Sequence, residues 1–315
     1  MIQNLNCNRI IFYILVFFSV GCKKDSSLLT QNSCNNPVFN SELPSYYQLF
    51  YRENGWTGGD AAYSIALSND KTLWLFGDTW YGEICEGKHA SGSTLPAHNT
   101  LAIQQGKDPA TACLNYYFGK SSSENLTSFF EPKDGVGLFW PNHGIVLNNK
   151  LYIIMVKVDY DTNAIGFKLI GTWLLTIDNP LDPPLQWQVT QLEIPHALFS
   201  NTKDIIFGSY LLEKNGSVYI YGNETNHDEG NRYLYLAKVP YDSLTYFNTW
   251  KFYNNGQWVN DYNSSEKLTD KIGIQFSVSY QPKIGKYILV TTELGFSKNI
   301  TIQYSDSLQG PWQAP

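Results

Sequence analysis

The sequence lacks the short motifs that identify several large enzyme classes. It contains no H-E-x-x-H, no paired C-x-x-C, no glycine-rich phosphate loop and no G-x-S-x-G. Such motifs supply metal ligands, a phosphate cradle or an activated serine. Their absence argues against a metalloprotease, a nucleotide-binding enzyme and an esterase. No metal and no cofactor are expected.

Positive charge is also scarce. The chain has 22 Lys and Arg against 28 Asp and Glu, a formal net charge of −6, and no basic block. This balance argues against nucleic acid or an anionic surface as a partner.

Only one long apolar run is present, IIFYILVFFSV at residues 10–20. It is too short to span a bilayer and matches the apolar region of a signal peptide. The following Gly21-Cys22 resembles a bacterial lipobox, whose cysteine is acylated and becomes the mature N-terminus. We therefore expect a lipoprotein of the bacterial cell envelope, held on the lipid membrane through Cys22. A plain secretory signal is the alternative. The expected segments are a signal peptide at 1–21, a polar tether at 22–37 and the folded domain at 38–315.

Cysteine is rare, with five in the whole chain. With Cys7 in the signal and Cys22 acylated, only Cys34, Cys85 and Cys113 are left. An exported location permits a disulfide, and a Cys85–Cys113 bridge would close one loop. Three cysteines cannot all pair, so at least one stands alone.

Aromatic residues are abundant, at 15% of the chain, with 22 Tyr and 9 Trp. Such rings suit strand-rich folds and also the apolar faces of sugars. A unit of two strands joined by a polar turn recurs four times. These units span 61–78, 143–156, 208–224 and 276–293. The recurrence predicts an all-β fold of the β-propeller type, with a β-sandwich as the alternative.

The first unit carries one aspartate near each outer end. If Asn69-Asp70 form a two-residue turn, Asp60 faces Thr79 and lies diagonally beside Asp78. Two adjacent carboxylates perturb each other's pKa values, as acid–base chemistry requires. The alternative is that each aspartate caps a turn.

The stretch GWTGGDAAYSIALSNDKTLWLFGDTWYG at 55–82 resembles the first blade of a bacterial propeller family long described as uncharacterised. That family is related to five-bladed glycoside hydrolases and includes endo-D-arabinanases. Similarity continues through HNTLAIQQG at 98–106 and on to the last residues. The resemblance implies that Asp60 is the base or nucleophile and that Asp78 is the family's second aspartate. Ala61 stands where the family usually has Gly.

The resemblance implies a five-bladed propeller over 38–315, although only four strand-pair units are found. We expect either that the last blade is incomplete or that residues 38–54 and the terminal strand close a smaller ring.

Several other residues are candidates for the site. Glu224 follows its strand as Asp78 does and is the reserve general acid, with Glu293 in a similar place. An exposed strand-end glutamate is the alternative for both. Further residues are expected to bind substrate, with burial in the core as the alternative reading. They are Tyr63, Trp80, Asn99, Trp140 and His143.

Taken together, the residues predict an exported glycoside hydrolase that cleaves a polysaccharide or oligosaccharide, possible substrates including an arabinan. The main alternative is a non-catalytic surface lipoprotein that binds glycans, and a third is a structural propeller without activity.

Overall fold

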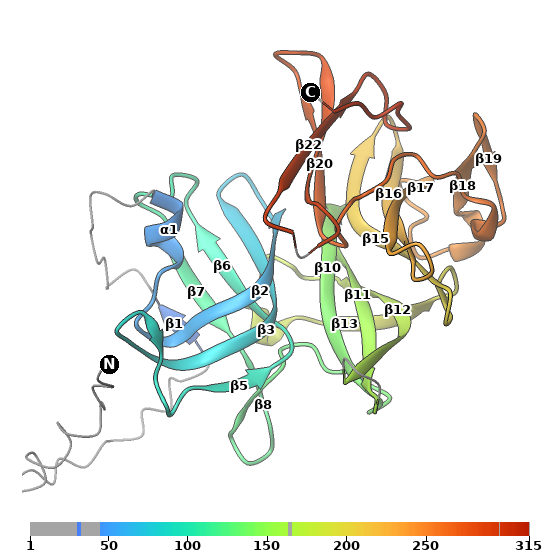
Figure 1. Cartoon of the computed structure of the whole chain (residues 1–315). Coiled ribbons are helices and arrows are strands. Elements are labelled where there is room, and N and C mark those ends of the chain that lie inside the picture. The colour runs from blue at the N-terminus through green and yellow to red at the C-terminus, as the bar shows by residue number, and fades with distance from the viewer. Residues whose placement is uncertain (1–29, 33–44, 163–165, 296, 315) are drawn as a thin grey trace, which may run out of the picture.

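The computed structural model describes residues 30–32, 45–162, 166–295 and 297–314. Within them, four antiparallel sheets follow one another along the chain (Figure 1). Each sheet is built around one of the predicted strand–turn–strand units, and we number the sheets as blades 1 to 4. The arrangement is that of a β-propeller, as predicted.

Blade 1 has the strand order β1-β7-β6-β3-β2, and β4 and β5 also pair with β3. Its strands are β1 (Thr30–Asn32), β2 (Asn54–Ala66), β3 (Lys71–Cys85), β4 (Lys88–His89), β5 (Thr94–Ala97), β6 (Thr100–Gln105) and β7 (Cys113–Tyr117). The helix α1 (Ser45–Phe50) packs beside β7. A small ribbon of β8 (Gly119–Lys120) and β9 (Leu126–Thr127) leads towards blade 2.

The other three blades have their strands in chain order. Blade 2 contains β10 (Leu138–Leu147), β11 (Lys150–Tyr160), β12 (Phe167–Ile177) and β13 (Val189–Ile194). Blade 3 contains β14 (Leu198–Phe199), β15 (Lys203–Lys214), β16 (Ser217–Asn226), β17 (Asn231–Pro240), β18 (Lys251–Asn254) and β19 (Gln257–Val259). Blade 4 contains β20 (Phe276–Gln281), β21 (Lys286–Thr292) and β22 (Ile300–Ser305). Short 3-10 turns occur at Pro184–Gln186, Phe247–Thr249 and Tyr262–Ser264.

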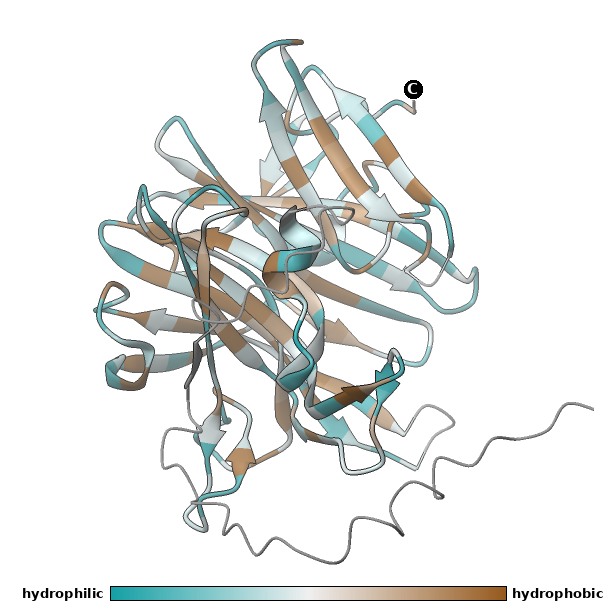
Figure 2. Ribbon diagram, turned by 90° about the vertical axis from the view of Figure 1, so that its left-hand side faces the viewer, coloured by the Kyte–Doolittle hydropathy of each residue, from teal (hydrophilic) through white to brown (hydrophobic). Residues whose placement is uncertain are grey.

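Apolar side chains fill the spaces between neighbouring blades. Successive residues of a strand point to opposite faces, so a middle blade needs apolar residues on both. In β11, Ile153 packs with blade 1 residues, whereas Ile154 packs with blade 3 residues. This explains the continuous apolar run in β11 and the brown bands along the strands in Figure 2.

The inner strands β2, β10, β15 and β20 contact one another in that order. The prediction of five blades needs correction, because the described residues form four. The expected closure of a smaller ring by residues 38–54 and the terminal strand is not seen in the described part of the chain. The described residues among 38–54 include α1, which packs beside β7, and the first residue of β2, all in blade 1. At the other end, Gln313 forms a bridge to Tyr304 of β22 in blade 4. Residues 30–32, within the expected tether, pair with β7.

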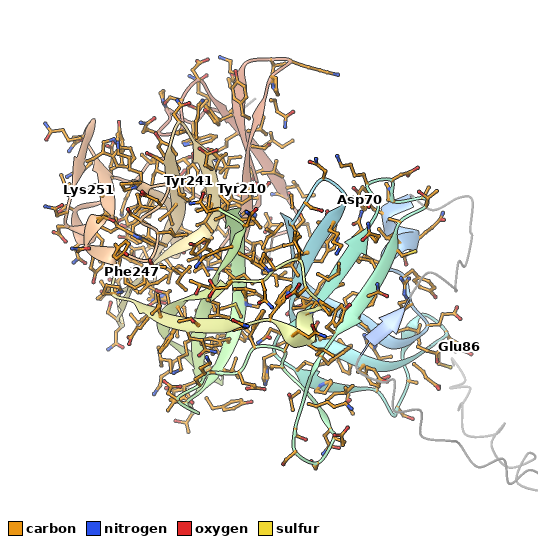
Figure 3. The ribbon with its side chains drawn as sticks, turned by 180° about the vertical axis from the view of Figure 1, so that it is seen from behind. Asp70, Glu86, Tyr210, Tyr241, Phe247 and Lys251 are labelled. Carbon is orange, nitrogen blue, oxygen red and sulfur yellow. The ribbon has the colours of Figure 1, made fainter. Side chains whose placement is uncertain are left out.

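The register of the first hairpin differs from the prediction by one residue. Tyr63 faces Leu75 and Ala66 faces Thr72, because the turn holds three residues, 68–70, rather than two. Bulges on both sides of Ala61, which faces Phe76, cancel each other, so that Gly59 faces Thr79 in the same register as Tyr63 and Leu75. Both strands also extend beyond the aspartates, since β2 begins at Asn54 and β3 ends at Cys85. Figure 3 shows the two ends of this hairpin, with Asp70 in its turn and Glu86 just after β3.

The proposed Cys85–Cys113 bridge is wrong. Cys113 is disulfide-bonded, but Cys85 is exposed and has no part in that bond. The partner of Cys113 lies outside the described residues, as does Cys22. In the described part of the chain, no helix has the length and apolar character needed to cross a membrane.

Candidate active site

Asp60 of β2 and Asp78 of β3 lie together at the bulge of the first hairpin. The Cβ of Asp60 sits over Gly77, where an added Cβ would be only 3.3 Å away. Glycine at 77 therefore lets the two strands approach at this point. Asp60 is exposed and Asp78 is half-buried. Both side chains are thus available to solvent.

The two carboxylates interact electrostatically. Partial burial and the negative charge of Asp78 both raise the pKa of Asp60 above its ordinary value. No lysine or arginine in the described residues forms an ion pair with either aspartate. No lysine or arginine therefore offsets the repulsion between them, and the nearest basic side chain is His98, at 3.0 Å from Asp78.

Asp78 is held by two nitrogen donors. The indole Nε1 of Trp140 donates to Oδ1 of Asp78 at 3.0 Å, and Nδ1 of His98 lies 3.0 Å from the same oxygen. Trp140 comes from β10 of blade 2, whereas His98 follows β5 of blade 1. One oxygen of Asp78 is therefore in contact with a donor group from each of two blades.

Backbone strain marks the same place. Ala61 and Ala62 have φ values of 70° and 65°, in the left-handed region that non-glycine residues rarely occupy. Each such residue costs roughly 1–2 kcal/mol. The strained pair directly follows Asp60, at the bulges between Gly59, which faces Thr79, and Tyr63, which faces Leu75. The one-residue shift in register places Asp60 at the level of Asp78 across the hairpin.

Two predicted binding residues have indole rings near the carboxylates. Trp140 is half-buried and packs edge-to-face on Phe167. Trp80 is 37% exposed and stacks on His89, with the ring centroids 4.3 Å apart. Because Asp78 and Trp80 are two residues apart on β3, their side chains leave the same face of the strand.

Three other predicted binding residues are buried. Tyr63 lies in the core between blades 1 and 2. His143 stacks on Tyr210, accepts a hydrogen bond from the Leu211 N–H at 3.1 Å, and has its pKa lowered to about 4 by burial. Asn99 binds backbone groups of Phe130 and Phe139. These three residues thus pack between neighbouring parts of the fold, as the alternative reading of burial in the core predicted.

Glu224, the reserve acid, lies in blade 3 and does not join the aspartate pair. Its side chain is 2% exposed and contacts Lys203 at 3.4 Å, Lys267 at 3.1 Å and the Tyr235 hydroxyl at 2.7 Å. Burial alone raises the pKa of Glu224, but these donors outweigh it and the pKa is lowered. Glu293 bonds to Asn299 at the end of blade 4.

Sequence reasoning missed His98, which contacts Asp78, and two residues that interact with His98, Tyr160 and Glu131. The Tyr160 hydroxyl lies 3.3 Å from Nε2 of His98, and burial raises the pKa of Glu131 against the opposing effects of His98 and a backbone hydrogen bond from Ser128. In the sequence, the only indication of a role for His98 was that it begins HNTLAIQQG, a stretch that belongs to the family resemblance. Among the described residues, no group of three His, Cys, Asp or Glu side chains is placed to hold a metal ion.

The fold and the site together define a β-propeller with a coupled carboxylate pair on its first blade. A family model described as a domain of unknown function, DUF5005, matches residues 44–315. The chain belongs to this family. A search of curated proteins gave no match.

Solved structures share the fold. A Bacteroides ovatus ATCC 8483 protein, provisionally described as a hydrolase, has a TM-score of 0.64 at 18% identity, over 85% of this chain and 71% of that one. An endo-arabinase from Bacteroides thetaiotaomicron VPI-5482 has a TM-score of 0.48 at 13% identity, over 85% and 81%. The α-L-arabinofuranosidase of Podospora anserina has a TM-score of 0.45 at 12% identity, over 84% and 69%. The likeness to the B. ovatus protein is one of fold.

Proposed function

We propose that the protein hydrolyses glycosidic bonds at the Asp60–Asp78 pair. The observation that carries the proposal is a solvent-accessible carboxylate, Asp60, that lies beside Asp78 and whose pKa is raised by partial burial and by the charge of that second carboxylate. Glycoside hydrolysis uses two carboxyl groups that flank the scissile bond. The B. ovatus protein with the same fold, provisionally described as a hydrolase, supports this choice.

Asp60 would act as the base or nucleophile. A raised pKa makes its carboxylate a stronger base, which helps it take a proton from water or attack the anomeric carbon. The bond from the anomeric carbon to the leaving oxygen breaks, and that oxygen receives a proton from a carboxylic acid. Asp78, which accepts two hydrogen bonds on one oxygen, would tune Asp60 through its charge.

The proton donor can be identified from leaving-group dependence. Asp78→Asn, Glu131→Gln and Glu224→Gln would each be assayed on a polysaccharide and on an aryl glycoside with an acidic phenol. Loss of the true donor slows the polysaccharide by about 10²–10⁴-fold and the aryl glycoside far less, because the phenol leaves without protonation. The contacts of Glu224 make it the weakest of the three candidates.

The proposed substrate is a polysaccharide or oligosaccharide, with arabinan the first to test because of the resemblance in the first blade. Trp80 offers an exposed ring beside the carboxylates on which a sugar can stack. That same ring favours a second candidate function, non-catalytic glycan binding. A protein that binds arabinan but releases no reducing ends from any polysaccharide would have this second function.

Anchoring by acylated Cys22 on the bacterial cell envelope belongs to the proposal as well. Incorporation of labelled fatty acid into the wild-type protein, and its loss in Cys22→Ser, would support it. Unlabelled wild-type protein would leave a plain secretory signal as the better account.

The hydrolase is tested with purified protein and a panel of plant and mycobacterial polysaccharides. Wild-type protein should release reducing ends from one of them, and Asp60→Asn and Asp78→Asn should each lower turnover by about 10²–10⁴-fold. Asp70→Asn, at the exposed turn of the same hairpin, is the matched control and should keep full activity. Equal turnover in all four proteins would refute the assignment.

A further inference from the structure

His98 lies between the two blades that meet at the carboxylate pair. One ring nitrogen, Nδ1, is 3.0 Å from Oδ1 of Asp78 in blade 1, and the other, Nε2, is 3.3 Å from the hydroxyl of Tyr160 in blade 2. The ring is about one-third exposed. Both of its polar atoms are therefore engaged, one with each blade.

The chemistry of the partners fixes the direction of one bond. An ionised carboxylate only accepts, so Nδ1 of His98 must carry the proton that it shares with Asp78. In the neutral ring, Nε2 then accepts from the Tyr160 hydroxyl, and in the charged ring it donates to that oxygen. The bond to Asp78 therefore survives a change in the charge of His98. Glu131 is a further ionisable group in this neighbourhood, and the charge of His98 acts to lower its pKa.

The backbone at His98 is anchored on both sides. The N–H of His98 donates to Oγ of the buried Ser128 at 2.9 Å. The side chain of the next residue, Asn99, makes three hydrogen bonds, two with Phe130 and one with Phe139 at the start of blade 2. The ring is thus presented to Asp78 by a backbone that cannot shift without breaking several bonds.

We propose that His98 is a positioning residue that holds the Asp78 carboxylate against Asp60. It shares the acceptor oxygen with Trp140, so the two donors together fix the orientation of Asp78. The catalytic consequence rests on the proposed hydrolase function, whereas the positioning itself is a property of the protein alone. The two parts can be tested separately.

Two amide variants separate the two contacts of the ring. In His98→Asn the side-chain amide nitrogen takes the place of Nδ1 and can still donate to Asp78. In His98→Gln it takes the place of Nε2 and faces Tyr160 instead. Both variants remove the histidine and its charge, so a difference between them reports on the bond to Asp78.

The structural readout is the indole N–H resonance of Trp140, assigned with Trp140→Phe. Because this N–H shares its acceptor with His98, the resonance should shift clearly in His98→Gln and little in His98→Asn. The control is His227→Asn in blade 3, where His227 lies 3.1 Å from Asp204, and it should leave the resonance in place. Equal shifts in the Asn and Gln variants would overturn the proposal.

A second measurement needs no variant. In wild-type protein at pH 8, the ring ¹⁵N shifts of His98 should show the proton on Nδ1, and a proton on Nε2 alone would overturn the proposal. For catalysis, kcat of His98→Gln should fall by about 10²-fold, with KM little changed, while His98→Asn recovers most of the loss. The Trp140 resonance could shift in the variants as predicted while the wild-type protein has no glycosidase activity. That result would contradict the hydrolase function and would still support the positioning role of His98.

Discussion

Blades 1 and 3 each have a carboxylate at the same position of a strand, but the two carboxylates differ in burial and in charged neighbours. Asp78 is the eighth residue of β3, which begins at Lys71, and Glu224 is the eighth residue of β16, which begins at Ser217. Glu224 is buried and contacts two lysines and a tyrosine. Asp78 is half-buried, has no lysine or arginine partner in the described chain, and has a second carboxylate as its neighbour.

This difference separates a stabilising carboxylate from a reactive one. The Tyr235 hydroxyl and two lysines lower the pKa of Glu224 and hold it ionised as part of the folded structure. Partial burial and a like charge raise the pKa of Asp60, which costs stability but gives a stronger base. The eighth residue of β11 is Lys157, which is ion-paired with Asp134, so blade 2 also neutralises its charge at this position. Asp78 of blade 1 has no lysine or arginine partner among the described residues and contacts His98 instead.

The largest expected change in stability comes from the carboxylate of blade 3, Glu224. Glu224→Gln leaves two lysines without their shared partner and should lower the free energy of unfolding at pH 7 by about 2 kcal/mol. Because the folded pKa of Glu224 is lowered, its contribution is present above the unfolded pKa of about 4.3 and is lost as pH falls through the folded pKa. Urea unfolding at pH 7 and pH 3 would check this, and an equal loss at both pH values would contradict it.

A smaller effect of opposite sign is expected from the strained turn of blade 1. Ala61→Gly replaces a residue at φ 70° with one that adopts this conformation freely. The variant should be more stable by about 0.5–1 kcal/mol, measured by urea unfolding. Ala66→Gly, in the regular part of β2, is the control and should be destabilised. A loss of stability in both variants would show that the Ala61 turn is not strained.

The smallest effect concerns the charge of Asp60. Its pKa is raised in the folded protein, so the ionised form costs stability above the raised pKa and nothing below the unfolded pKa of about 4. Asp60→Asn should therefore raise the melting temperature at pH 7 by at most about 2 °C and leave it unchanged at pH 3. Calorimetry at the two pH values is the measurement. A lower melting temperature at pH 7 would mean that Asp60 stabilises the fold.

Much of the fold followed from local pattern. Alternating apolar residues around turn-forming pairs located all four hairpins, and the two-residue turns at Asn148-Asn149 and Asn215-Gly216 have the positive φ values that such residues allow. The first hairpin was misaligned by one residue because Ser68 joins its turn. Bulges are not visible in a sequence, since they depend on pairing across strands.

The site was only partly predictable. Asp60 and Asp78 could be found because the hairpin that joins them is local. His98, which contacts Asp78, and Tyr160, which contacts His98, could not, because they come from separate segments of the chain. Tyr63 and His143 looked suited to binding but are buried where neighbouring blades pack together. Burial of this kind depends on the arrangement of whole blades.

The central claim is that Asp60 and Asp78 form one coupled carboxylate pair. Titration of ¹³C-labelled Asp side-chain carboxyls by NMR, in wild-type protein and in Asp78→Asn, tests it most directly. The Asp60 resonance should titrate above the ordinary aspartate range in the wild type and move towards that range in the variant, since one cause of its raised pKa is removed. An Asp60 that titrates identically in the two proteins would contradict the account.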